Sequence, residues 1–178
     1  MDIIMNKKFS SKKSLGHSRT GEAKKVVMVS GGFDPIHPGH TRLFEEAKKL
    51  GDKLVVVINN DNWICVKKGH GFMSAEDRAE VISSFRYVDE VIISKHKKNT
   101  KDMSISRELL EIRPHIFANG GDRNEKDSKD PNSSLYKDIE MCKKLGIEIV
   151  FNVGYGGKIR SSSELLKEYL KKHNKNKK

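Results

Sequence analysis

With 178 residues, the chain is long enough for one domain with its own hydrophobic core. Charged residues make up 33% of it and apolar residues 35%, and no apolar run approaches the roughly 20 residues of a membrane-spanning helix, so we expect no membrane partner. The formal net charge of +11 would favour a nucleic-acid partner if it were spread over the folded part, but it is not.

The basic charge lies in two terminal segments. Residues 1–25 carry seven Lys or Arg against two acids, and residues 171–178 carry five lysines and no acid, which leaves +1 for the 145 residues between them. We therefore expect a basic flexible N-terminal extension (1–25), one folded domain (26–170) and a Lys-rich C-terminal tail (171–178). A weak nucleic-acid contact through these tails stays open.

The sequence favours a cytoplasmic protein. The apolar residues 3–5 are followed at once by lysines, so they lack the core of a signal peptide, and the first 25 residues show no clear amphipathic helix of the transit-peptide kind. Cys65 and Cys142 lie far apart in the chain and form no CxxC pair. We expect both to be reduced thiols, as in a reducing compartment.

From residue 26 onward, strand and helix patterns alternate. In chain order we predict a strand at 26–29, a helix at 39–50, a strand at 54–58, a long loop at 59–73, a helix at 74–85, a strand at 91–93, a helix at 105–112, a strand at 115–118, a helix at 133–145, a strand at 147–151 and a helix at 162–172. This alternation predicts an α/β fold, a Rossmann-like single domain with a five-stranded parallel sheet and helices on both faces. Ligands in such folds bind beyond the carboxyl ends of the strands.

The loop after the first predicted strand has the sequence GGFDPIHPGH, from Gly31 to His40. Two glycines allow a ligand to approach the backbone closely, and a proline at the start of the next helix is well placed. His37 and His40 lie three residues apart around that helix start, where free N–H groups favour a phosphate. Each imidazole can donate a hydrogen bond to a phosphate oxygen. A zinc pair is the alternative, but no third His or Cys lies nearby.

This segment resembles the HxGH signature of the nucleotidyltransferase superfamily, which includes glycerol-3-phosphate cytidylyltransferase, the heptose-phosphate adenylyltransferases and pantetheine-phosphate adenylyltransferase. The resemblance continues along residues 26–170. It includes the lysines before Gly69, the Arg-containing start of the next helix, the cytidylyltransferase-like RYVDEV stretch at 86–91, the GGD at 120–122 and the serine run at 161–163.

The resemblance implies that a phosphate oxygen of an acceptor attacks the α-phosphorus of CTP or ATP, that pyrophosphate leaves, and that Mg²⁺ is bound with the nucleotide rather than by a protein metal site. Catalysis then depends on positioning and charge stabilisation. The catalytic residues implied are His37, His40, Lys68 and Arg78. The nucleotide-binding residues implied are Gly31, Gly32, Phe33, Asp34, Lys67, Gly120, Gly121, Asp122, Arg160, Ser161, Ser162 and Ser163.

Several alternatives stay open. Lys67 and Lys68 have the composition of ordinary surface charges, the serine run is also a helix cap, and Arg78 has acids beside it on a helix that could pair with it. Asn119 stands where heptose-phosphate adenylyltransferases often have Lys, which leaves CTP or ATP and the identity of the small phosphomonoester undecided. The resemblance also allows a homodimer. The rival function is an inactive nucleotidyltransferase fold that binds nucleic acid through its basic tails.

Overall fold

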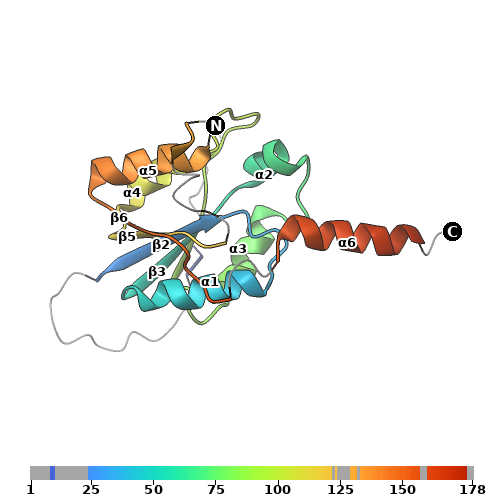
Figure 1. The fold of residues 1–178 in the computed structure, drawn as a ribbon, viewed down its shortest axis with the longest axis horizontal. Helices are drawn as coiled ribbons and strands as arrows, with labels where there is room; N and C mark the ends of the chain where they lie inside the picture. The colour runs from blue at the N-terminus through green and yellow to red at the C-terminus, as the bar shows by residue number, and fades with distance from the viewer. Residues whose placement is uncertain are drawn as a thin grey trace.

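The computed structural model describes residues 9–10, 24–121, 123, 129–131, 133–156 and 160–175 (Figure 1). Its elements are β1 (Phe9–Ser10), β2 (Val26–Gly31), α1 (Pro38–Lys49), β3 (Lys53–Ile58), α2 (Asp61–Lys68), α3 (Ala75–Ser83), β4 (Glu90–Ile93), α4 (Ser106–Ile112), β5 (Ile116–Ala118), α5 (Ser134–Leu145), β6 (Glu148–Val150) and α6 (Ser162–Lys175). Every predicted strand and helix is present, with boundaries that differ by at most a few residues.

The sheet has the strand order β1-β4-β3-β2-β5-β6. The five strands from β2 to β6 are parallel to one another, which confirms the predicted α/β fold. In the register at the centre, Met28 of β2 lies opposite Val55 of β3 and Phe117 of β5. The central strands read as continuous apolar runs because both faces of the sheet are covered.

Each face of the sheet has its own hydrophobic core. On one face Val27 and Val29 pack with Phe44 of α1 and Ile82 of α3, whereas on the other face Met28 packs among residues of α4 and α5. The alternation follows the two-residue period of a strand. Figure 1 shows α4 and α5 on one side of the sheet, α1 on the other, and α6 extending away from the body.

The strand order reverses at β2. The chain runs from β2 to β3 and β4 on one side, and then returns to place β5 on the other side of β2. The loops that follow β2 and β5 therefore diverge and leave a crevice between them at the carboxyl ends of the strands.

Three expectations need correction. The predicted loop at 59–73 contains the helix α2, which is short but is capped by the Asn60 side chain and buries Trp63 and Ile64. The segment expected to be a flexible extension contributes Phe9–Ser10 as a short antiparallel strand against β4. The last helix extends to Lys175, into the expected tail. Within the described residues, no helix is long and apolar enough to cross a membrane.

Candidate active site

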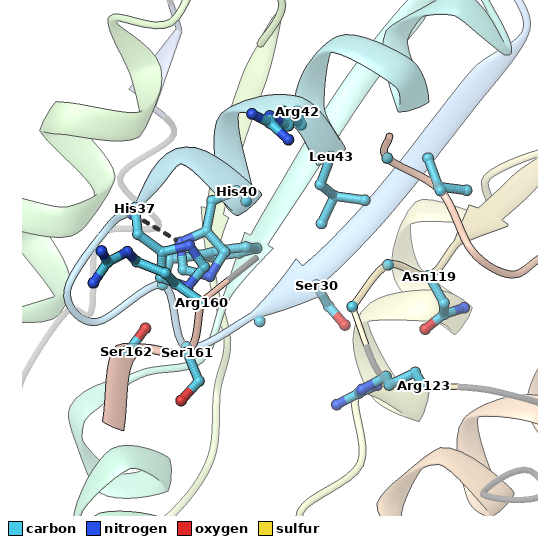
Figure 2. Close-up of a pocket in the computed structure, with 18 of the residues that line it drawn as sticks. Ser30, His37, His40, Arg42, Leu43, Asn119, Arg123, Arg160, Ser161 and Ser162 are labelled. Atoms are coloured by element: carbon cyan, nitrogen blue, oxygen red, sulfur yellow. Dashed lines mark hydrogen bonds between the residues drawn. The ribbon is translucent and has the colours of Figure 1, made fainter. Parts of the chain in front are cut away.

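A pocket of about 450 Å³ opens at the crevice between the ends of β2 and β5 (Figure 2). It contains most of the site residues predicted from the sequence, brought together from four separate segments. They are Gly31, Gly32, Phe33, His37, His40, Lys67, Lys68, Gly120, Gly121, Arg160, Ser161, Ser162 and Ser163. The described part of the chain therefore places the motif residues around one shared space.

The loop between β2 and α1 is shaped by the ring of Phe33. This residue has a positive φ of 50°, and its ring folds back over Gly31, where an added Cβ would lie only 2.9 Å from it. The ring is buried and makes an edge contact with the His40 imidazole, with 4.9 Å between the ring centroids. Phe33 thus forms an apolar backing that holds His40 at the start of α1.

The two histidines lie directly against each other. Their rings are stacked with centroids 3.7 Å apart, and the His37 backbone N–H donates to His40 Nδ1 at 3.3 Å (dashed in Figure 2). Because Nδ1 of His40 accepts a hydrogen bond, its proton belongs on Nε2, which leaves an N–H donor for a ligand. His37 is buried, and its Nδ1 has no partner among the described residues.

Both imidazoles are held neutral. Burial, followed by the effects of His37 and Lys68, lowers the pKa of His40 to about 3. Burial also lowers the pKa of His37, and Arg160 and Lys68 act in the same direction. The pair therefore suits hydrogen-bond donation to an anion without a change of protonation near neutral pH.

We expect the His40 ring to stay neutral between pH 8 and pH 5 in the folded protein. NMR spectra of histidine-labelled protein should show no His40 titration in this range, while the same ring in the urea-unfolded chain titrates near pH 6.5. Since only the unfolded chain takes up this proton, the His40 contribution to stability is full above pH 6.5 and falls by about 1.4 kcal/mol per pH unit below it. An inflection above pH 5 in the folded state would contradict the assignment.

The lysines at the end of α2 reach the pocket from another side. Lys68 is half-buried, and its Nζ donates to the carbonyl oxygen of Asp34 at 2.8 Å. Burial lowers its pKa, and Arg78 adds to this while Asp34 opposes it. Lys67, on the same last turn, also lines the pocket. Both are thus fixed to a helix rather than carried on a loop.

The start of α6 lines another side of the pocket. Ser161 Oγ accepts from the Glu164 N–H and Glu164 Oε2 accepts from the Ser161 N–H, both at 3.1 Å, which is a capping box. Ser162 Oγ donates to the Pro35 carbonyl at 2.9 Å and ties the helix start to the β2–α1 loop. The predicted helix cap and the predicted anion site thus use the same residues.

Two predicted site residues, Asp34 and Arg78, do not line the pocket. The buried carboxylate of Asp34 accepts hydrogen bonds from the N–H groups of Phe72 and Met73, at 2.8 and 2.9 Å. It fastens the segment after α2 against the β2–α1 loop. In the structure, the side chain of Asp34 thus has a structural role, and its predicted contact with nucleotide stays a prediction.

The guanidinium of Arg78 is fully buried behind the pocket and does not pair with its acidic neighbours on α3. It donates to the Asp61 carboxylate at 2.6 Å and to four backbone carbonyl oxygens, those of Gly32, Asn59, Met73 and Ser74. These acceptors lie in the β2–α1 loop, in the segment between β3 and α2, at the start of α2 and in the segment before α3. Arg78 is thus a positioning residue.

Of the predicted site residues, Asp122 lies outside the described residues.

Other pocket residues were not predicted from the sequence. They come from the ends of β2, β5 and β6, from α1 and from α2: Ser30, Arg42, Leu43, Trp63, Asn119, Arg123, Asn152, Val153, Gly154 and Tyr155. For those that follow β5 and β6, the position after a strand end was the available signal. Asn119 Nδ2 and Arg123 Nη1 are buried and have no partner among the described residues.

Residues 28–174 match the family model described as cytidylyltransferase-like. The FAD synthase of Picrophilus torridus is 34% identical over 155 residues, which are 84% of this chain and 99% of that protein. The glycerol-3-phosphate cytidylyltransferase of Bacillus subtilis is 37% identical over 98 residues, 55% of this chain and 72% of that protein. The crystal structure of a lipopolysaccharide core biosynthesis protein from Thermoplasma volcanium aligns with a TM-score of 0.57 and 30% identity, covering 75% of this chain and all of that one.

The fold and the site together define an α/β nucleotidyltransferase. The chain belongs to the cytidylyltransferase-like family, which confirms the resemblance inferred from the HxGH segment.

Proposed function

We propose that this enzyme transfers a nucleoside monophosphate from CTP or ATP to a small phosphorylated acceptor. A phosphate oxygen of the acceptor forms a bond to the α-phosphorus, the bond from that phosphorus to the bridging oxygen of the β-phosphate breaks, and pyrophosphate leaves. The attacking oxygen is already anionic, so no general base is needed. The observation that carries the proposal is the stacked, neutral pair His37 and His40 at the start of α1, inside a basic pocket.

Each part of the pocket has a place in this reaction. The two imidazoles donate to the oxygens around the α-phosphorus, where charge builds up in the transition state. Lys67 and Lys68 contact the acceptor phosphate and the triphosphate from the α2 side. The N-terminus of α6, with Ser161 to Ser163, holds the leaving pyrophosphate. Mg²⁺ enters bound to the triphosphate, because this ion prefers phosphate and water ligands. The cationic and hydroxyl groups of the pocket lining then contact the triphosphate rather than the ion.

The names of the relatives supply acceptor candidates. FAD consists of an adenylyl group joined to flavin mononucleotide, which is itself a phosphomonoester, and glycerol 3-phosphate and ethanolamine phosphate are the acceptors named for two cytidylyltransferase relatives. Sugar phosphates extend the same class.

We place the activity in the cytoplasm.

Two assays test the proposal. A thermal-shift screen with CTP, ATP, GTP and UTP plus Mg²⁺ identifies the base, because a ligand at 100 times its Kd stabilises the fold by about 2.7 kcal/mol. Pyrophosphate release is then measured with the preferred nucleotide and each acceptor candidate. We expect release that requires both substrates and persists when the basic segments 1–25 and 171–178 are removed. Nucleotide-independent RNA binding that is lost on this trimming, without pyrophosphate release, would favour the rival function instead.

A further inference from the structure

The pocket has two chemically different ends. Figure 2 shows His37, His40, Arg160, Ser161 and Ser162 together on one side, while Asn119 and Arg123 lie on the other. The first end carries the cationic and helix-start groups that suit phosphates. If the triphosphate binds there, as the proposed function requires, the nucleoside extends into the other end.

At this other end, the segments that follow β5 and β6 pack closely against each other and against α1. At Gly120 an added Cβ would lie 2.6 Å from the Val153 carbonyl oxygen and 2.9 Å from Leu43 Cδ1. Gly154 has a φ of +112°, and a Cβ added there would lie 3.7 Å from the backbone nitrogen of Leu43. These contacts pack the segment that carries Tyr155 against Leu43 of α1 and against the end of β5.

An aromatic side chain is held rigidly at the rim of this end. The Arg42 guanidinium lies 4.6 Å from the centroid of the Tyr155 ring, and Arg42 Nη1 donates to the Tyr155 carbonyl oxygen at 3.3 Å. Both residues line the pocket, and Tyr155 is 52% exposed. One contact fixes the ring and the other fixes its backbone, so little further ordering is needed when a ligand stacks on the exposed part of the ring.

A second observation at the same end also points to a ligand. Asn119 is 4% exposed, yet its Nδ2 has no partner among the described residues, and Arg123 Nη1 is likewise buried and unpartnered. Buried donors without an acceptor are costly, so such groups commonly mark a place that a polar ligand completes. A nucleoside carries ring and hydroxyl acceptors for them.

We propose that Tyr155, held in place by Arg42, is the stacking platform for the nucleotide base. Base–aromatic stacking tolerates every base, because each has a π-face. The pair therefore determines the affinity for the nucleoside part of the NTP, while the polar groups at Asn119 and Arg123 face its acceptor atoms.

The test compares two probes, the preferred NTP with Mg²⁺ and inorganic tripolyphosphate with Mg²⁺, by calorimetric titration. Tyr155→Ala is expected to raise the Kd for the NTP about tenfold and to leave the Kd for tripolyphosphate unchanged. Tyr155→Phe, which keeps the ring, should restore NTP binding. Arg42→Lys keeps the charge but loses the planar group, so we expect a loss of about threefold for the NTP. Tyr169→Ala, an exposed tyrosine on α6 outside the pocket, is the matched control.

The outcomes separate this inference from the proposed function on which it rests. Equal NTP affinities of the wild type and Tyr155→Ala overturn the platform but leave the nucleotidyltransfer proposal in place. A parallel loss for both probes also overturns it, since that indicates general damage to the pocket. If the wild type binds tripolyphosphate but none of the four NTPs, the proposed function fails and the platform fails with it.

Discussion

His40→Ala is expected to lower kcat by roughly 100- to 1,000-fold, with a much smaller change in the KM for the NTP. In the proposed reaction, the fixed, neutral His40 N–H donates to an oxygen on the α-phosphorus, where negative charge builds up in the transition state. Loss of one such donor in other enzymes has an effect of this size. The measurement is steady-state pyrophosphate release with the preferred NTP and acceptor.

His40→Asn and His70→Ala are suitable comparisons for this variant. Asparagine offers an N–H donor of different reach, so we expect it to recover part of the lost rate. His70 is exposed and does not line the pocket, so its replacement is expected to leave kcat unchanged. A kcat for His40→Ala within threefold of the wild type would remove His40 from the mechanism.

Arg78→Leu is expected to lower the free energy of unfolding by about 3–5 kcal/mol, because it removes a fully buried guanidinium and leaves its acceptors, among them the half-exposed Asp61 carboxylate, without a donor. Four carbonyl oxygens and the Asp61 carboxylate lose their partner at once. Urea unfolding measures the loss. Arg78→Lys restores the charge but only one donor group, and we expect it to recover less than half of the stability.

The matched control for Arg78 is Arg107→Leu. Arg107 is exposed and pairs with Glu111 one helical turn away, an arrangement worth about 0.5 kcal/mol or less. If Arg78→Leu lowered the free energy of unfolding no more than this control does, the buried guanidinium would not be what holds the segments around the β2–α1 loop together.

The sheet and the end of the pocket that carries His37 and His40 could be predicted from the sequence because their signals are local. Apolar runs such as residues 54–58 define strands by themselves, and GGFDPIHPGH follows a strand and opens a helix, so its position at the sheet edge is implied. The helix α2 escaped prediction because it is only eight residues long and begins with polar residues, and its stability comes from burying Trp63 and Ile64.

The end of the pocket beside Tyr155 and the contacts of Asp34 and Arg78 depend on tertiary structure. Arg42 and Tyr155 are 113 residues apart and meet only because β6 follows β5 at the sheet edge. A motif gives the residue type at a position but not the direction of the side chain. Asp34 and Arg78 both follow the family pattern, yet they point behind the pocket, where their hydrogen bonds are made with backbone groups.

The most direct test of the central claim is a crystal structure of the enzyme with Mg²⁺ and a non-hydrolysable analogue of the preferred NTP. We predict the α-phosphate within hydrogen-bond distance of His37 and His40, the β- and γ-phosphates at Ser161 to Ser163, and the base between Gly120 and Tyr155. A nucleotide bound in the opposite orientation, or bound without contact to either histidine, would contradict the assignment of this pocket as the nucleotidyltransfer site.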